Sequence, residues 1–467
     1  MEANNAIYGF GDQEELTMLD EPGFDKTTVT KAELQKQTDA IPDKNPHSFL
    51  KQIFVIDDTL TNKISYYHIL LLLFSLPFDL FYSHIILISF GLHTLINLKK
   101  ENVRSIFNVR TVILQSAFFI TLLGIAYSPN KGAGFTELGR QLAILLIPIL
   151  FSTTSLDLKK YKDNFLLGFS LCSTLTIAYL YLDALRVIHY YGYSIETLFS
   201  AAFTNHNFSD PVGMHATFLA LQVGLALVYL LSVLINSTKI NAKLFYGACC
   251  GLLSIGLLQL SSKSVCVTIL IAVCIALPFF ILKGKRKRSQ FIIVSFAVVL
   301  FSTLILSRSQ TFRDRFFNDL KDDISQSTNG DITDPRLSRW KVAGELIIKS
   351  PVIGYGSGAE TDLLSKGYFD KKLYNSFLNK LNAHNEYLSL LLATGILGLL
   401  IYLSTLYYGF KNAMASKDVL YLTFILLIVI VSLSENVLDV DKGTMFYGLF
   451  FSFFAFTNSG IKELKKQ

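Results

Sequence analysis

The sequence has few charged residues and few cysteines, prolines and tryptophans. Only 17% of its 467 residues are Asp, Glu, Lys or Arg, and it contains 5 cysteines, 10 prolines and one tryptophan. Beside 51% hydrophobic residues, this charged fraction is too low for a soluble protein of this length. The sequence also lacks the period-two alternation that a transmembrane β-barrel needs. The class that remains is a helical membrane protein.

The five cysteines indicate neither a metal site nor a disulfide. All of them lie inside apolar runs, and none has a metal-ligand spacing such as C-x-x-C. They are Cys172, Cys249, Cys250, Cys266 and Cys274. We interpret them as small packing residues, and we expect no bound metal and no cofactor.

Apolar runs long enough to cross a bilayer recur between residues 64 and 457. They predict an all-α polytopic membrane protein with about 12 transmembrane helices. The expected spans are residues 64–79, 83–98, 110–127, 138–155, 164–183, 211–235, 244–261, 264–282, 290–307, 385–409, 419–433 and 443–457.

The positive charges in the connections predict the orientation. One alternate set of connections carries nineteen Lys and Arg residues, including the run "KGKRKR" at 283–288. The opposite short connections hold few, such as Lys131, Arg186 and Lys442. The positive-inside rule places the first set, and with it both termini, in the cytoplasm.

The expected spans divide the chain into five regions. Residues 1–60 form a polar, acidic cytoplasmic tail that we expect to be disordered, because twelve Asp and Glu face five Lys and Arg in its first 58 residues. The others are helices 1–9 at 61–307, a periplasmic loop at 308–384, helices 10–12 at 385–460 and a cytoplasmic tail at 461–467. In the loop, "PRLSRWKVAGELIIKS" predicts an amphipathic helix at Leu337–Lys349.

Polar residues gather at one side of this topology. Charged groups in membrane segments are costly and often mark function. The residues concerned are Arg140, His215, Lys263, Arg336, Arg339, His384, Glu435 and Asn436, all at or near the expected outer face. Each also has a purely structural interpretation, such as snorkelling to the interface, packing, helix capping or pairing with a nearby charge. Their shared location favours one outward-facing cavity.

The most specific pattern starts the tenth expected span. On a continuous helix, about 100° per residue places Gly395 and Gly398 on nearly the same face as His384. Glycines on one face allow a second helix to approach closely. An imidazole that a packed helix holds at the aqueous edge of the membrane is suited to act as a general base. The alternative interpretation is a histidine at the membrane interface, with glycines that serve only helix packing.

These residues resemble those of the bacterial O-antigen ligase and O-antigen polymerase superfamily. The pattern H-N-x9-G-x-x-G, from His384 and Asn385 to Gly395 and Gly398, matches that of the ligases. The block "RLSRWKVAGELIIKSPVIGYGSG" is similar to the family's outer-loop block and selects Arg336 over Arg339. "HATFLAL", from His215, and "SENVLDVDKG", with Glu435, are similar to further family segments. The resemblance covers roughly residues 64–457.

The resemblance implies a GT-C-like membrane glycosyltransferase of the bacterial inner membrane. Its donor would be a polysaccharide on undecaprenyl diphosphate, and its acceptor lipid A–core or a similar glycan. His384 would act as the base, with Arg336, Lys263 and Arg140 on the diphosphate and His215, Arg339, Asn385 and Glu435 as supporting residues. Where the family commonly has Ser-Arg, this chain has Ser262-Lys263, which keeps the charge but loses the bidentate fork.

Two other functions stay open at this point. A polymerase would add the glycan to another lipid-linked repeat, and it has the same kind of site. A polysaccharide or lipid transporter would carry its ionisable residues at the middle of the spans. For all three, membrane lipids are partners and nucleic acid is not.

Overall fold

The computed structural model describes residues 51–318, 321 and 334–458, and in these ranges it contains helices and no strand. Most of the expected N-terminal tail and all of the expected C-terminal tail at 461–467 lie outside the described residues. The described residues belong to one compact unit, which extends over 46–467.

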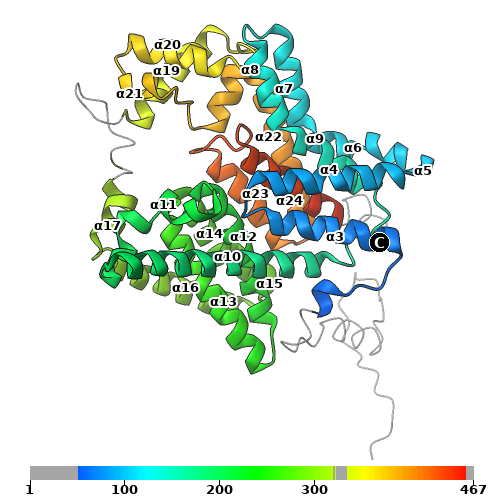
Figure 1. The fold of residues 1–467 in the computed structure, drawn as a ribbon, viewed down its shortest axis with the longest axis vertical. Helices are drawn as coiled ribbons and strands as arrows, with labels where there is room; N and C mark the ends of the chain where they lie inside the picture. The colour runs from blue at the N-terminus through cyan, green and yellow to red at the C-terminus, as the bar shows by residue number, and fades with distance from the viewer. Residues whose placement is uncertain (1–50, 319–320, 322–333, 459–467) are drawn as a thin grey trace, which may run out of the picture. The chain divides into compact units, whose positions relative to one another are not determined.

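A helix occupies every range in which the sequence predicts a span (Figure 1). In the first part of the chain these are α3 (Leu60–Ser75), α4 (Leu80–Ile96), α6 (Val109–Leu114), α7 (Ser116–Tyr127), α8 (Lys131–Arg140), α9 (Leu142–Thr153), α10 (Lys162–Tyr191), α12 (Ala216–Asn236) and α13 (Ile240–Leu260). They are followed by α14 (Lys263–Ile271), which continues through a π-helical turn into α15 (Leu277–Ile281), and by α16 (Lys285–Leu306), α22 (Glu386–Ala415), α23 (Val419–Val431) and α24 (Asp441–Thr457).

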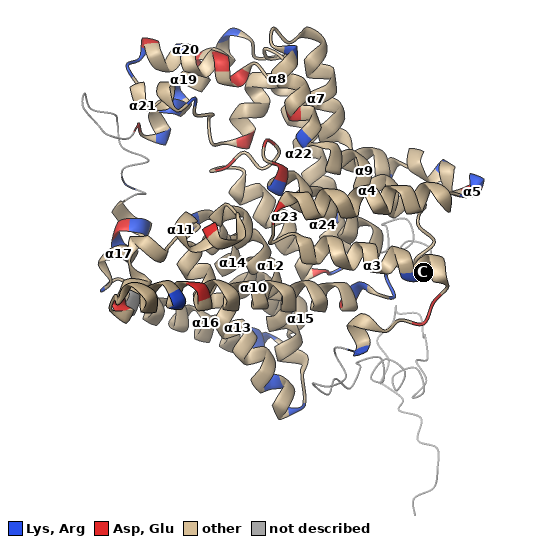
Figure 2. Cartoon of the chain, in the orientation of Figure 1, with Lys and Arg blue, Asp and Glu red and all other residues tan. Residues whose placement is uncertain are grey.

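Seven of the described helical segments are long and apolar enough to cross a membrane. They are Lys131–Thr153, Lys162–Tyr191, Ala216–Asn236, Ile240–Leu260, Lys263–Ile281, Lys285–Leu304 and Glu386–Ala415. Three shorter helices, α4, α7 and α23, are also apolar. The ribbon in Figure 2 shows acidic and basic residues mostly near helix ends and in connections. The chain is therefore a helical membrane protein, and the count of twelve spans stays a prediction.

Helix α12 lies at the centre of the largest apolar core. Its residues from Ala216 to Leu230 are all buried, which is the pattern of a helix surrounded by other helices. It packs against α10, α13, α14 and α23, while α24 packs along α9. The outer surface of the unit keeps many exposed apolar side chains, of which Ile96 on α4 is 84% exposed.

A second, smaller core joins the end of the long loop to α22. The amphipathic helix expected at 337–349 is present as α19 (Arg336–Lys349), and it is followed by α20 (Glu360–Asp370) and α21 (Tyr374–Leu378). Val342 and Ala343 of α19 are buried against Leu364 and Tyr368 of α20 and Leu392 of α22. This apolar contact places α19 and α20 over the first turns of α22.

The prediction of a continuous helix from His384 through Gly398 is wrong, because α22 begins at Glu386 and is interrupted at Gly395. Gly395 has φ +64° and ψ −163°, which are not helical values. A Cβ at Gly395 would collide with the backbone of Val352, so this position requires glycine for both its φ and its lack of a side chain. Gly398 lies beyond the break, and a Cβ there would come within 3.1 Å of Ile120 on α7.

The loop that follows α19 supplies the hydrogen bonds that the broken helix lacks. The N–H of Tyr355 donates to the carbonyl of Leu392 (2.8 Å), and the N–H of Gly356 donates to that of Ala393 (2.8 Å). In return, the N–H of Ile396 donates to the carbonyl of Pro351 (2.9 Å). Since unpaired backbone groups are costly in an apolar setting, the break in α22 and the loop at 351–356 depend on each other.

We expect Gly395→Ala to destabilise the protein by at least about 1–2 kcal/mol, because it adds left-handed strain to a backbone collision. The change is measured as a lower midpoint of thermal unfolding in detergent. Gly344→Ala is the matched control, since Gly344 lies in α19 and a Cβ added there would have no atom of a neighbouring element within 4 Å. An unchanged midpoint in Gly395→Ala would contradict the close approach of the loop.

Candidate functional site

His384 lies in a tight turn just before α22. Its φ is +47°, in the left-handed region that few non-glycine residues adopt. Asn385 forms the N-cap of α22, and its side chain accepts hydrogen bonds from the N–H groups of Tyr387 and Leu388. The His384 Nδ1 is 3.5 Å from the Oε2 of Glu435, and the His384 side chain is 32% exposed. The histidine is therefore held beside a carboxylate and still reaches the surface.

Helices α19 and α20 hold this turn through its backbone. The Trp340 Nε1 donates to the carbonyl of Ala383 (2.9 Å), and an Arg339 guanidinium nitrogen lies 3.4 Å from the carbonyl of Asn382. The N–H of Ala383 donates to the Glu360 Oε1 (2.9 Å). Arg339 is buried, so its contacts give it a structural role in the turn.

The segment after α23 connects the turn with the cationic residues. The N–H of Glu386 donates to the carbonyl of Ser432 (2.9 Å). Arg336, the first residue of α19, donates to the carbonyl of Ser434 (3.2 Å). The hydroxyls of Ser434 and Ser264 are 3.1 Å apart, which brings the start of α14 to the same segment.

Lys263 is the first residue of α14 and precedes Ser264. The Arg336 side chain and the start of α14, where Lys263 lies, therefore both reach the segment that carries Glu435. His384, Arg336, Lys263 and Glu435 were expected in one place from the sequence, and the structure brings the segments that carry them together.

Electrostatics favour a charged carboxylate at Glu435. Burial acts to raise the pKa of Glu435, but the hydrogen bond from His384 and the positive charge of neighbouring groups, Arg336 among them, outweigh it, so the pKa lies below its usual value. An ionised Glu435 beside His384 stabilises an imidazolium when His384 takes up a proton.

His215 belongs to the same neighbourhood but is held as a neutral ring. It precedes α12 as its N-cap, and its ring centroid is 4.2 Å from that of His206 in the short helix α11 (His206–Ser209). Burial lowers the pKa of His215 to about 4, although the charge of Glu435 opposes this effect. Its Nδ1 is buried and has no hydrogen-bond partner among the described residues. His206 was not among the residues expected from the sequence.

Arg140 lies at a different feature, a cluster of carboxylic acids. A guanidinium nitrogen of Arg140 donates to the carbonyl of Asp439 (3.2 Å). The Asp439 side chain lines a small cavity, of about 20 Å³, together with Glu137, Glu360 and Glu386. The N–H of Gly358 donates to Glu137 (2.8 Å), and that of Leu438 donates to Glu386 (2.8 Å).

These four acids were not predicted from the sequence. Glu386 follows the H-N pair directly, and Asp439 lies within "SENVLDVDKG". The sequence signal that could have identified Glu386 and Asp439 is their position next to motif residues, because carboxylates are rare in so apolar a chain. No group of three or more His, Cys, Asp and Glu in the described ranges is placed to hold a metal ion.

The two acids outside the apolar helices have perturbed pKa values. Burial, with the charge of Asp439, raises the pKa of Glu360 to about 7. Burial also raises the pKa of Asp439, against its hydrogen bond from Asn436 and the charge of Arg140. Burial therefore favours the protonated forms of Glu360 and Asp439 more than water does.

Taken together, the fold and the site define a helical membrane protein whose imidazole, carboxylate and cationic groups meet where α19 and α20 cover the ends of apolar helices. Residues 248–403 match a family model described as O-antigen ligase. This match includes Lys263, Arg336 and the pattern from His384 to Gly398, and it supports placing the chain in the O-antigen ligase superfamily, as a membrane enzyme of the ligase or polymerase type. No curated protein matches the chain.

We expect stability to fall with rising pH through Glu360. Its folded pKa of about 7 lies above its ordinary value of 4.5, so between these values the folded state keeps a proton that the unfolded state loses. Glu360→Gln keeps an acceptor for the N–H of Ala383 but cannot ionise. The thermal midpoints below and above this pH window should therefore differ less in the variant than in the wild type.

Glu345→Gln is the control for this measurement. Glu345 is paired with Lys371 (2.8 Å) on the surface, where its side chain is 55% exposed. This control should keep the pH dependence of the wild type. An equal pH dependence in Glu360→Gln and the wild type would contradict a raised pKa at Glu360.

Proposed function

We propose that this protein is a membrane glycosyltransferase that transfers a polysaccharide from undecaprenyl diphosphate to lipid A–core or a similar acceptor. The observation that carries the proposal is the contact between His384 and Glu435, 3.5 Å apart, on a turn that α19 holds and on a segment that Arg336 contacts. The family match to O-antigen ligase supports the same reaction class.

In this proposal His384 is the general base. Its Nδ1 faces Glu435, which leaves Nε2 for the acceptor hydroxyl. The hydroxyl proton passes to Nε2, and the new imidazolium is stabilised by the Glu435 carboxylate. Glu435 acts through His384, as a positioning residue.

The bond that breaks joins the anomeric carbon to the diphosphate. The acceptor oxygen bonds to that carbon from the opposite face, and the electron pair of the breaking bond leaves with the diphosphate, so the configuration inverts. Arg336 and Lys263 supply positive charge for this leaving group. Arg336 can form a bidentate contact, whereas Lys263 acts as a point charge. We propose that these side chains do so without a metal ion.

Arg140 takes a lesser role in this assignment. Its guanidinium contacts the backbone of Asp439 at the acid cluster. Arg140 can contact the diphosphate only if its exposed side chain moves. His215 is assigned to the wall of the site, because burial keeps its ring neutral.

The positive-inside pattern supports a site on the periplasmic side of the inner membrane, with both termini in the cytoplasm. Helices α19 and α20 then cover the site from the aqueous side and limit hydrolysis of the donor. The lipid tail of the donor would stay among the apolar helices.

A polymerase of lipid-linked repeats is the second candidate, because it breaks the same bond and differs only in the acceptor. The two are separated in cells that lack the gene. Loss of a polymerase leaves single repeats on lipid A–core, whereas loss of a ligase leaves long lipid-linked chains unattached. A transporter is less well supported, because His384, Glu435, Arg336 and Lys263 lie at helix ends and in connections.

The proposal is tested by transfer from a lipid-linked oligosaccharide in the reconstituted protein. We expect His384→Ala and His384→Asn to reduce the rate by about 10²–10⁴-fold, the usual contribution of a general base. The asparagine variant is included because asparagine tolerates a positive φ, so the turn is retained. His189→Ala, at an exposed position near the end of α10, should keep full activity. Wild-type rates in both His384 variants would remove the histidine from the mechanism.

Arg336→Lys tests the contact with the diphosphate. The variant keeps the charge but loses the planar fork, so we expect a rate at least about tenfold lower if the contact is bidentate. Arg186→Lys, at an exposed arginine paired with Asp183, is the control and should leave the rate unchanged. A fully active Arg336→Lys enzyme would reduce the role of Arg336 to charge alone.

A further inference from the structure

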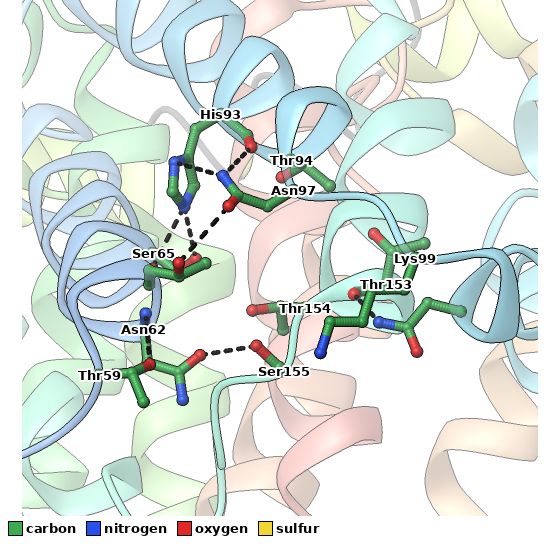
Figure 3. A pocket seen from close by; sticks show the side chains of 12 residues that line it. Thr59, Asn62, Ser65, His93, Thr94, Asn97, Lys99, Thr153, Thr154 and Ser155 are labelled. Atoms are coloured by element: carbon green, nitrogen blue, oxygen red, sulfur yellow. Dashed lines mark hydrogen bonds between the residues drawn. The ribbon is translucent and has the colours of Figure 1, made fainter.

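A second cavity, unrelated to the site around His384, lies between α3, α4 and the end of α9. It has a volume of about 390 Å³, and its lining residues in the described ranges are all polar: threonines, serines, asparagines, one histidine and one lysine (Figure 3). None of these described lining residues is an acid. In a chain with 51% hydrophobic residues, a cavity lined in this way requires an explanation.

This polar cavity lies at the far end of α9 from the acid cluster. Gln141, which precedes α9, lines the acid cavity, and Thr153, its last residue, lines the polar one. The 12 residues of α9 separate the two by about 18 Å. Leu95 and Ile96 on α4 are 68% and 84% exposed and adjoin the lining residues Thr94 and Asn97. The cavity therefore opens beside a strongly apolar surface.

The lining is organised by hydrogen bonds among its own residues. The Ser65 hydroxyl and the His93 Nε2 are 3.2 Å apart, and the Ser155 hydroxyl donates to the Asn62 Oδ1 (2.7 Å). The Asn102 Nδ2 donates to the carbonyl of Thr153 (2.9 Å). Figure 3 shows the first two of these bonds joining residues from separate segments of the chain. The polar groups are thus held in place before any ligand binds.

The groups that stay available include hydrogen-bond donors. The hydroxyls of Thr59 and Thr154 accept backbone N–H groups, from Asn62 and Leu156, so each keeps its own proton for another acceptor. The ammonium of Lys99 makes no hydrogen bond or ion pair in the described part of the chain, and Lys99 lines the cavity. A cation with hydroxyl donors around it matches an anion with several acceptor oxygens.

We propose that this cavity binds a phosphate group. A volume of about 390 Å³ holds a phosphate with a small polar substituent. The exposed apolar residues beside the opening favour a phospholipid headgroup, whose acyl chains would lie along α4. A soluble phosphate ester carries the same chemistry and is the other source. Because the described lining residues are all different from those around His384, this proposal does not depend on the proposed function.

The test measures the thermal midpoint of the full-length protein in detergent during titration with three probes. Dihexanoyl phosphatidylglycerol carries phosphate and chains, glycerol phosphate carries phosphate alone, and dihexanoylglycerol carries chains alone. We expect the first to raise the midpoint and the last to have no effect. A rise with phosphatidylglycerol alone identifies a lipid headgroup site, and an equal rise with glycerol phosphate identifies a site for soluble phosphate esters.

Three substitutions show whether the cavity is responsible. Lys99→Met should lower the affinity for the phosphate-bearing probes, read from the titration of the thermal midpoint, by about tenfold, as expected for loss of a charged hydrogen bond. Lys99→Arg should keep it. Lys100→Met is the matched control, because Lys100 is exposed and adjacent but does not line the cavity. Equal responses in Lys99→Met and Lys100→Met, or a response to the chains without phosphate, would overturn the proposal.

Discussion

The structure around His384 depends on the backbone pairing between the break in α22 and the loop at 351–356. A helix among apolar helices cannot leave its carbonyl groups unpaired, and here the N–H groups of Tyr355 and Gly356 satisfy those of Leu392 and Ala393. This pairing fixes the end of α19 against α22. The loop is also tied to α7, because the Tyr127 hydroxyl donates to the carbonyl of Ile353 (2.6 Å). The loop that joins α19 to α20 is therefore attached to both α22 and α7.

Two polar groupings then lie near the first turn of α22. On one side, the hydrogen bond from His384 and the charge of Arg336 favour the ionised form of Glu435. On the other, burial raises the pKa values of Glu360 and Asp439, and the charge of Asp439 raises that of Glu360 further. The segment at 432–440 takes part in both, since Glu435 faces His384 and Asp439 lines the acid cavity. At Glu435 a hydrogen bond and nearby positive charge outweigh burial, whereas at Asp439 the charge of Arg140 does not.

Some of the candidate site could be predicted from the residues because their type is so unusual in an apolar chain. His384, Arg336, Lys263 and Glu435 were expected together on the basis of topology and family resemblance, and their segments meet in the structure. The acids at Glu137 and Glu360 could not be found this way. Each lies in a segment with other polar residues, and only the tertiary structure brings them to one cavity with Glu386.

Hydrophobic patterning by itself determined the class of this protein and the helix in each expected range, because bilayer-length apolar runs leave the backbone few alternatives. It also determined the amphipathic helix α19. The tertiary structure alone decided that α22 breaks at Gly395, since a glycine in an apolar run fits a continuous helix equally well until a loop backbone approaches it. The same holds for the polar cavity at Lys99, whose residues come from three separate segments and have no shared pattern along the chain.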